Sequence, residues 1–318
     1  MNEFDLIRTY FTHPAPGALL GVGDDAALLS VGGKGGALAI STDMLVAGRH
    51  FFPDADPRAL GHKALAVNLS DMAAMGATPR WATLSLALPE ADPAWLASFA
   101  EGFWALARRF GVELVGGDTT RGPLNICVTI LGEVPARHAL RRDAARPGDD
   151  IWVSGHLGNA ALALAAFHHR LQLSPRDLAA CLPALHTPEP RVSLGLALRG
   201  IARAAIDVSD GLLADLGHIA ERSAVAAVVE WRRLPRSPVM ERYLTDPVAR
   251  VALVAGGDDY ELCFTAGRRR RSRIEALSRI LTPPLTRIGR VEEGSGVRVV
   301  DADGRTLDFA EKGFDHFR

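Results

Sequence analysis

PRALGHKALAVNLSDMAAM (residues 57–75) decides the fold of this chain, because it predicts a helix that is buried on all sides. Asp56 is placed to cap the start of the helix, and Pro57 suits its first position, where a missing backbone N–H costs nothing. Gly76 suits a left-handed position after the last turn, and Pro79 prevents the helix from continuing. Along its C-terminal half almost every side chain is small or apolar, whichever face it lies on. A helix of this composition is normally covered by other elements on every face.

Asp71 is the exception in this helix. The three- and four-residue spacing places it on one face with Leu60, Ala64, Val67 and Ala74. An unpaired carboxylate is costly to bury, so Asp71 should be protonated, paired or bound to a metal ion. The helix alone leaves two interpretations open: an acid bonded to nearby backbone or an arginine, or a residue of a functional site.

The composition of the 318 residues is typical of a folded protein of one large or two ordinary domains. Hydrophobic residues make up 48%, the formal net charge is −1, and no apolar run approaches the ~20 residues of a membrane span. We therefore expect neither a membrane nor a nucleic-acid partner. The start of the chain lacks the features of a signal peptide, and Cys127, Cys181 and Cys263 form no disulfide or zinc pattern, which favours a cytoplasmic location. The run RRRRSR (residues 268–273) predicts a solvated loop and helix start rather than a nucleic-acid patch.

Strand and helix patterns alternate on both sides of a polar, arginine-rich stretch, residues 135–150, which contains Pro147-Gly148. We take this stretch as a linker between an N-terminal domain, residues 1–137, and a C-terminal domain, residues 148–318. In the first part we predict strands at residues 37–42, 83–88, 112–115 and 125–134, and helices at 57–75 and 92–110. In the second part we predict strands at 151–155, 225–231 and 260–265, and helices after Gly158, from Pro190, up to Ser223 and near 247–255. The fold class is therefore predicted as mixed α/β (α+β) with two domains.

Acidic residues follow the predicted strands at turns that contain glycine. The turns are GVGDDAAL (residues 21–28), GGDTTR (116–121), IDVSDGL (206–212) and GGDDYEL (256–262), and STD (41–43) ends a further strand. Each alone is explained by the frequency of Asp and Gly in turns. Their repeated occurrence after strands instead predicts a ligand site, because ligands of open α/β sheets bind at the carboxyl ends of strands.

Side chains that offer only oxygen atoms favour Mg²⁺, Mn²⁺ or Ca²⁺ over zinc or iron. Mg²⁺ usually binds a few carboxylates together with substrate phosphates, so a nucleotide or another polyphosphate is expected. The chain has no G-x-x-x-x-G-K-[ST] loop, and in the loose dinucleotide pattern at residues 21–26 Asp24 and Asp25 would face a pyrophosphate without a cation between them. The pattern predicts an enzyme that holds phosphates through metal ions, with Arg121 and Arg142 available as direct phosphate partners.

Seven segments of the chain, in this order, resemble the thiamine-monophosphate kinase family. They are GVGDDAAL, STDMLVAGRHF (41–51), KALAVNLSDMAAMGATP (63–79), GGDTTR, AIDVSDGLLADLGH (205–218), GGDDYELCFT (256–265) and GFDHF (313–317). The resemblance implies a two-domain fold like that of aminoimidazole ribonucleotide synthetase, with an N-terminal domain whose sheet forms a homodimer interface and a C-terminal α/β domain. It also implies direct transfer of the γ-phosphoryl group of ATP to thiamine monophosphate, with several Mg²⁺ ions, to give thiamine diphosphate and ADP.

The resemblance further implies roles for individual positions. The implied metal ligands are Asp24, Asp25, Thr42, Asp43, Asp71, Asp118, Asp207 and Asp210, of which Asp71 and Asp210 are implied to be catalytic. The implied ATP contacts are Ser41, Gly117, Asp118, Arg142 and Ser209, and the implied substrate contacts are His50, Asp258 and Phe314. This chain has Asp258 where the family usually has Glu, and Phe314 where it often has Tyr, so the acid and the aromatic face are kept.

Elementary chemistry agrees with these roles. A phosphate oxygen is already anionic near neutral pH, so the main obstacle is the repulsion between two anions, which metal ions reduce. The thiazolium ring of thiamine is cationic, and Asp258 and Phe314 suit such a group. For His50 an ordinary hydrogen-bonding role at a strand end stays open.

Two kinds of alternative are considered. One is another enzyme of the same superfamily: aminoimidazole ribonucleotide synthetase, selenophosphate synthetase or a hydrogenase maturation factor. The latter two would be expected to have a reactive cysteine near the N-terminus or at the C-terminus, whereas here the first cysteine is Cys127 and the chain ends GFDHFR. The other alternative is a protein that binds a magnesium nucleotide without turnover.

Overall fold

The computed structural model describes residues 3–12, 14–31, 35–311 and 313–314, and in it the chain divides into two compact units. The N-terminal unit comprises Gly17–Ala139 and His186–Leu196, and the C-terminal unit comprises Met1–Pro16, Leu140–Leu185 and Ala197–Arg318. The main division falls inside the stretch taken as a linker. The division differs from the predicted domains, 1–137 and 148–318, in two short segments. Residues 1–16 are grouped with the C-terminal unit, and residues 186–196 are grouped with the N-terminal unit. Contacts of that kind leave no local pattern in the sequence.

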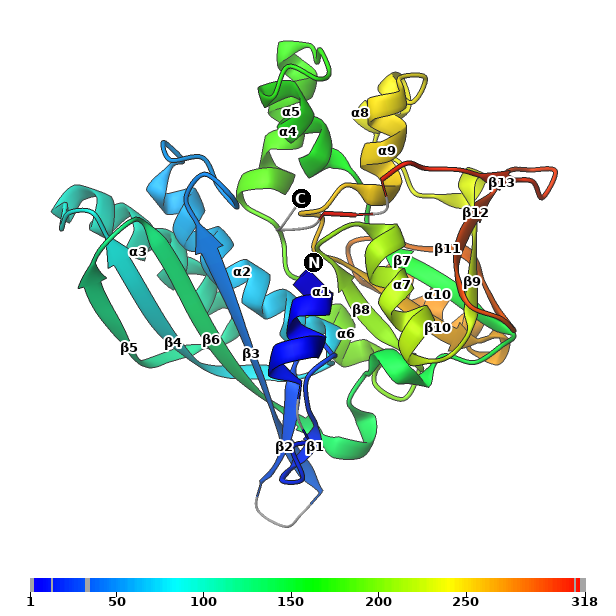
Figure 1. Cartoon of the computed structure of the whole chain (residues 1–318), viewed down its shortest axis with the longest axis horizontal. Helices are drawn as coiled ribbons and strands as arrows, with labels where there is room; N and C mark the ends of the chain where they lie inside the picture. Colours follow the sequence, from blue (N-terminus) through cyan, green and yellow to red (C-terminus); the bar gives the residue numbers. More distant parts are fainter. Residues whose placement is uncertain (1–2, 13, 32–34, 312, 315–318) are drawn as a thin grey trace. The chain divides into compact units, whose positions relative to one another are not determined.

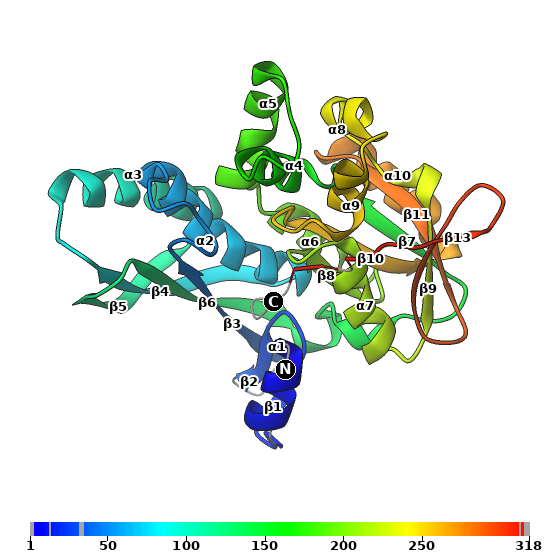
Figure 2. The same ribbon diagram turned by 45° about the horizontal axis from the view of Figure 1, so that its top comes forward.

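The N-terminal unit is built on a six-stranded sheet in the order β1-β2-β3-β6-β4-β5. Its strands are β1 (Ala18–Leu20), β2 (Ala27–Val31), β3 (Gly36–Val46), β4 (Thr78–Leu88), β5 (Glu113–Arg121) and β6 (Asn125–Pro135). Neighbouring strands are antiparallel except β4 and β5, which are parallel because a helix connects them. The helices α2 (Pro57–Ala74) and α3 (Pro93–Phe110) lie along one face of this sheet (Figures 1 and 2). The other face is called the outer face below.

Helix α2 begins and ends as predicted. The side chain of Asp56 accepts a hydrogen bond from the backbone N–H of Ala59 at 2.8 Å, and Gly76 has a φ of 60°. The sheet covers one side of α2 and α3 covers another, which explains why the helix is apolar on nearly every face. At the crossing of the two helices, a Cβ on Gly61 would lie 2.0 Å from the carbonyl oxygen of Phe99. The helices therefore approach each other backbone to backbone.

Strand β5 continues through Gly116-Gly117, where the sequence predicted a turn. The register between β4 and β5 shifts next to this pair, which is typical of a β-bulge. Gly117 has a φ of 152°, and a Cβ there would lie 1.9 Å from the carbonyl oxygen of Leu84. Gly117 thus allows a close approach to β4, and the chain does not reverse here. The predicted turn was wrong, and Asp118 lies within a strand.

The C-terminal unit is built on a seven-stranded sheet in the order β13-β12-β9-β11-β7-β10-β8, and this second sheet confirms the mixed α/β class. Its strands are β7 (Asp149–Ser154), β8 (Ala205–Val208), β9 (Ala226–Glu230), β10 (Glu261–Gly267), β11 (Leu285–Glu292), β12 (Gly296–Val300) and β13 (Thr306–Leu307). Its helices are α1 (Glu3–Leu6), α4 (Asn159–Phe167), α5 (Pro175–His186), α7 (Leu212–Arg222), α8 (Pro238–Tyr243), α9 (Pro247–Ala255) and α10 (Arg271–Ile280), and α6 (Val192–Leu198) crosses the division between the units. Short helices occur at η1 (Ile7–Phe11), η2 (Ala136–His138), η3 (Arg142–Ala144), η4 (Trp231–Arg233) and η5 (Arg268–Arg270). Helices α5 and α8 were not predicted.

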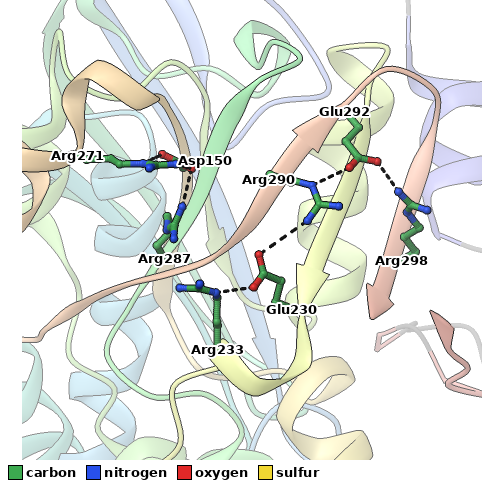
Figure 3. Close-up of polar contacts among 8 residues, drawn as sticks. All are labelled: Asp150, Glu230, Arg233, Arg271, Arg287, Arg290, Glu292 and Arg298. Atoms are coloured by element: carbon green, nitrogen blue, oxygen red, sulfur yellow. Dashed lines mark hydrogen bonds and ion pairs between the residues drawn. The ribbon is translucent and has the colours of Figure 1, made fainter. Parts of the chain in front are cut away.

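The arginine run at residues 268–273 forms η5 and the start of α10, as expected for a helix start. Arg271 donates from Nε to Oδ2 of Asp150 at 2.6 Å, and Nη1 of Arg287 donates to Oδ1 of the same carboxylate at 3.3 Å (Figure 3). These arginines thus help to hold α10 and β11 to β7. Among the described residues, no helix has both the length and the apolar character needed to cross a membrane.

A second group of ion pairs joins β9, β11 and β12 (Figure 3). On β11, Arg290 donates to Glu292 at 2.7 Å. Glu292 also pairs with Arg298, on β12. The strand register places Arg290 and Arg298 on either side of Val228, whose side chain is fully buried. The long arginine stems can therefore cover apolar sheet surface while their charged ends stay in water.

Candidate active site

Carboxylates gather in the N-terminal unit on the face of the sheet that α2 covers. Oxygen atoms of Asp25 and Asp71 lie within 4.8 Å of one another, and Asp25 is only 6% exposed. The hydroxyl of Ser41, on β3, donates a hydrogen bond to Oδ2 of Asp71, on α2. Since side chains alternate along a strand, Asp43 lies on the same face as Ser41. The predicted residues Asp25, Ser41, Asp43 and Asp71 are thus brought together.

Hydrogen bonds also hold the backbone next to this cluster. The N–H of Asp43 donates to Oδ1 of Asn68 at 3.3 Å, and Asn68 donates in turn to the carbonyl oxygen of Ala64 at 3.0 Å. Asp24 accepts a hydrogen bond from the N–H of Asp25 at 3.2 Å, which fixes the turn that carries both acids. Asn68 was not singled out in the sequence, although it lies three residues before Asp71 on the same helix.

The electrostatics of this cluster favour a cation. Burial, together with the negative charge of Asp25, raises the pKa of Asp43 to about 6. Burial and the charge of Asp43 also raise the pKa of the Cys127 thiol. Carboxylates this close to one another repel when ionised, and hard divalent cations prefer carboxylate oxygens as ligands. The residues of the cluster therefore fit Mg²⁺.

Thr42 and Asp118 lie elsewhere, on the outer face of the sheet. The hydroxyls of Thr42 and Thr129 are 2.9 Å apart on that face. Strand pairing puts Met44, Cys127, Ser85 and Asp118 in one row across four strands. Asp118 is thus three strand spacings, about 14 Å, from the strand that carries Asp43. The structure does not bring Asp118 to the Asp71 cluster of the same chain, and Gly117 lies beside it against β4.

His50 lies in the turn that follows β3. The N–H of Val46 donates to Nδ1 of His50 at 2.9 Å, so hydrogen-bond geometry assigns the proton of the neutral ring to Nε2. The ammonium of Lys63, a buried side chain of α2, donates to the carbonyl oxygen of His50 at 3.4 Å. The ring is therefore oriented by its own turn, and its donor is Nε2–H.

In the C-terminal unit the end of β8 carries the predicted residue Asp207, and the loop after β8 carries Ser209 and Asp210. Asp207 is 4% exposed, at the end of the strand. Asp215, in the first turn of α7, accepts hydrogen bonds at one oxygen, Oδ2, from the N–H groups of Ser209, Asp210 and Gly211. Asp215 was not singled out in the sequence, because an acid in the first turn of a helix is common for capping alone.

Burial raises the pKa of Asp215 well above its ordinary value, and the charges of Asp210 and Asp207 act in the same direction. The positive charge of Arg142, on η3, opposes this rise. Arg142 is itself tied down, since its carbonyl oxygen accepts a hydrogen bond from the Ser223 hydroxyl at 2.7 Å. The charge of the predicted ATP contact Arg142 thus acts on Asp215, as do the charges of the predicted metal ligands Asp207 and Asp210.

The predicted substrate residues Asp258 and Phe314 are bonded to this loop. The N–H of Asp258 donates to the carbonyl oxygen of Ser209 at 2.8 Å, and the N–H of Phe314 donates to that of Asp210 at 2.9 Å. Asp258 has a φ of 64°, and its Oδ1 accepts a hydrogen bond from the hydroxyl of Tyr260 at 3.0 Å. A left-handed backbone is uncommon for a residue other than glycine, and such conformations concentrate at functional sites. Of the closing GFDHF segment, residues 315–317 lie outside the described residues.

Comparison with known proteins identifies the family to which this fold and these acidic loops belong. Residues 23–134 match the family described as AIR synthase related protein, N-terminal domain. The thiamine-monophosphate kinase of Salmonella typhimurium (strain LT2) is 48% identical over 321 residues, which cover 99% of this chain and 98% of that protein. The chain belongs to the thiamine-monophosphate kinase family.

Solved structures agree with this assignment. The crystal structure of thiamine-monophosphate kinase from Stenotrophomonas maltophilia K279a is 49% identical with a TM-score of 0.81, and the match covers 92% of this chain and 93% of that one. A structure of AaThiL complexed with AMPPCP and TMP is 32% identical with a TM-score of 0.84, covering 99% of this chain and 97% of that one. The likeness therefore extends over both units of the chain.

Proposed function

We propose that this protein transfers the γ-phosphoryl group of ATP directly to thiamine monophosphate, giving thiamine diphosphate and ADP. The observation that carries the proposal is the group of carboxylates formed by Asp25 and Asp71, with Asp43 close enough to feel the charge of Asp25, in a chain that matches a thiamine-monophosphate kinase over 99% of its length. A terminal phosphate oxygen of thiamine monophosphate forms the new bond to the γ-phosphorus, and the bond to the oxygen that bridges to the β-phosphorus breaks. The attacking group is largely ionised at neutral pH, so no protein base is required.

We propose metal ligands in each unit separately. In the N-terminal unit they are Asp24, Asp25, Asp43 and Asp71, and in the C-terminal unit they are Asp207 and Asp210. When bound, several Mg²⁺ ions neutralise the phosphates, so that the anionic acceptor can approach. The Ser41 hydroxyl fixes the orientation of the Asp71 carboxylate, and Asn68 fixes the backbone of Asp43.

Nucleotide and substrate are proposed to bind through the other family positions. Ser41, Gly117, Arg142 and Ser209 contact ATP in this proposal. His50 donates from Nε2, while Asp258 and Phe314 face the cationic thiazolium ring of thiamine. The Tyr260 hydroxyl holds the Asp258 carboxylate in place, which compensates for a side chain one methylene shorter than the usual Glu. We also propose that the enzyme works in the cytoplasm, since its three cysteines are free thiols.

We further propose a homodimer, in which Asp118 serves the site of the partner copy. One Mg²⁺ joins ligands at about 2.1 Å, so Asp118 and Asp43 of the same chain, about 14 Å apart across the sheet, cannot share an ion. The outer face that carries Asp118 and Thr42 exposes Met44 at 53% of its surface. It also carries a hollow of ≈ 370 Å³ lined in part by Met44 and Asp118. A second copy that covers this face would bury Met44 and bring its Asp118 toward Thr42.

The kinase assignment is tested by ADP release from the purified protein with ATP, Mg²⁺ and one of three acceptors: thiamine monophosphate, thiamine or none. We expect release with thiamine monophosphate alone, and loss of that release when EDTA removes the metal ion. Equal release in all three samples would point to another enzyme of the superfamily. Binding of ATP without any release would support a non-catalytic nucleotide-binding protein.

A further inference from the structure

We propose that Asp215 is a positioning residue, which holds metal ligands and substrate contacts of the C-terminal unit in one geometry. The proposal rests on the proposed kinase function for its kinetic test. Asp215 belongs to none of the sets of residues assigned above to metal, nucleotide or substrate. Its side chain is 3% exposed, in the first turn of α7.

The donor groups of the loop converge on Asp215. Its Oδ2 accepts the N–H of Ser209 at 3.1 Å, that of Asp210 at 3.1 Å and that of Gly211 at 3.0 Å. Three consecutive N–H groups that point at one oxygen define the backbone angles of the loop closely. The backbone of the loop in turn sets the direction in which the side chain of Asp210 projects. Asp210 lies three residues after Asp207.

The acceptor groups of the same loop extend this control to the substrate residues. The carbonyl oxygens of Ser209 and Asp210 accept the N–H groups of Asp258 and Phe314, respectively. The loop therefore lies between Asp215 on one side and both proposed thiamine contacts on the other. A shift of the loop would move the metal ligand and the thiamine contacts together.

Close packing leaves the loop little room for another conformation. A Cβ on Gly211, which has a φ of 118°, would lie 2.7 Å from the carbonyl carbon of Ala255. A Cβ on Gly257 would lie 2.3 Å from the carbonyl oxygen of Ser209. Without its acceptor at Asp215 the loop would leave three N–H groups unsatisfied, which proteins rarely tolerate. Loss of the carboxylate is therefore expected to force the loop out of this packed conformation.

The test compares Asp215→Ala, which removes the acceptor, with Asp215→Asn, which keeps an oxygen at the same place. Steady-state rates are measured against thiamine monophosphate and against Mg²⁺. For Asp215→Ala we expect the KM for thiamine monophosphate and the Mg²⁺ concentration for half-maximal rate to rise by about 10- to 100-fold, as for other residues that orient metal ligands. For Asp215→Asn we expect both values to stay within about threefold of the wild type, because one amide oxygen accepts the same three bonds.

Asp177→Ala is the matched control for a general loss of stability. Asp177 is likewise a buried acid in the first turn of a helix, and it accepts hydrogen bonds from Tyr243 and Arg242, away from the proposed site residues. We expect its melting temperature to fall while both kinetic constants remain those of the wild type. A merely structural role of Asp215 would give the same result for Asp215→Ala, which would overturn the proposal.

Three further outcomes bear on the positioning role of Asp215 and on the proposed function. If Asp215→Asn is as impaired as Asp215→Ala, the charge rather than the acceptor geometry matters, and the positioning role is refuted. If Asp215→Ala does not fold, Asp215→Ser replaces it, because its short side chain cannot reach all three N–H groups, and unchanged constants would then refute the role. If the wild type shows no release of ADP that depends on thiamine monophosphate, the proposed function fails. The rise in melting temperature on adding Mg²⁺ then tests positioning alone, with a smaller rise expected for Asp215→Ala than for Asp215→Asn.

Discussion

The half-buried Asp43 carries its carboxylate close to that of Asp25, and without a bound cation this arrangement is costly. The folded-state pKa of about 6 lies above the ordinary value of 3.8, so the contribution of Asp43 to folding stability is largest below pH 4 and declines as the pH rises through 6. At neutral pH, therefore, ionised Asp43 opposes folding until a cation compensates for it. Such a cost is expected where function rather than stability determines the residue.

Asp43→Asn should raise stability in the absence of Mg²⁺. Removal of the charge relieves burial and repulsion, and we expect the free energy of unfolding at pH 7.5 to rise by roughly 1 to 2 kcal/mol. The same substitution should reduce the stabilisation that the wild type gains on adding Mg²⁺. Thermal unfolding with EDTA and with Mg²⁺ measures both effects. A lower melting temperature for Asp43→Asn in EDTA would show that the acid is paired rather than repelled.

Asp177 gives a pH dependence of the opposite sign. Hydrogen bonds from Arg242, Ser174 and Tyr243 lower its pKa to about 2. Its stabilising contribution is therefore complete above about pH 4 and is lost as the pH falls toward 2. Urea unfolding of the wild type and of Asp177→Asn should differ by a constant amount from pH 7 to pH 4, and the difference should shrink below pH 4. A difference that persists unchanged at pH 2 is incompatible with this pKa.

At the scale of elements, local signals predicted some features and long-range contacts decided others. Helix α2 was predictable because its cap, its first proline and its terminal glycine are all local. Only the start of β5 was predicted, at residues 112–115, because pairing with β4 determines whether the chain bends or continues at Gly116-Gly117. Helix α5 was missed although Leu178, Cys181, Leu182 and Leu185 recur at helical spacing. Helix α8, with 6 residues, is too short to show a period. The pairing of the two helices through Asp177 and Arg242 joins residues 65 positions apart.

Gly102→Ala should weaken the packing of α3 on α2. A Cβ at this position would lie 1.9 Å from the carbonyl oxygen of Arg58, so the helices must separate. We expect a loss of about 1 to 3 kcal/mol, typical of overpacking. Gly217→Ala in α7 is the matched control, since a Cβ there meets nothing within 4 Å. There we expect a gain of up to about 1 kcal/mol from helix propensity. Chemical denaturation measures the change in the free energy of unfolding of each variant. A stabilised Gly102→Ala would contradict the close crossing of the two helices.

At the scale of the whole molecule, the sequence predicted a set of acidic site residues but not how the fold groups them. Asp25, Asp43 and Asp71 could be proposed as ligands one by one. The separation of Asp118 from Asp43 follows only from strand order and from the alternation of side chains, which no local pattern reveals. Asp215 was missed for a related reason, since its importance depends on a loop that folds back onto α7.

Subunit complementation tests the shared site. Asp71→Asn and Asp118→Ala should each be inactive alone. In mixed dimers one site combines an intact Asp71 with an intact Asp118 from the partner, so mixing equal amounts should restore about a quarter of wild-type activity. The control mixes Asp71→Asn with Asp43→Asn, which belong to one cluster and should not complement. Failure of the first pair to complement, with mixed dimers demonstrated, would place Asp118 outside the partner's site.

The most direct test of the central claim follows the phosphoryl group itself. ATP labelled in the γ-phosphate is incubated with wild-type protein, Mg²⁺ and thiamine monophosphate, and the label is traced in the products. We predict that the label appears in thiamine diphosphate, one for each ADP formed, and that Asp71→Asn, folded as judged by circular dichroism, transfers none. Label found only in inorganic phosphate would contradict direct transfer to thiamine monophosphate, and undiminished transfer by Asp71→Asn would contradict the role of Asp71.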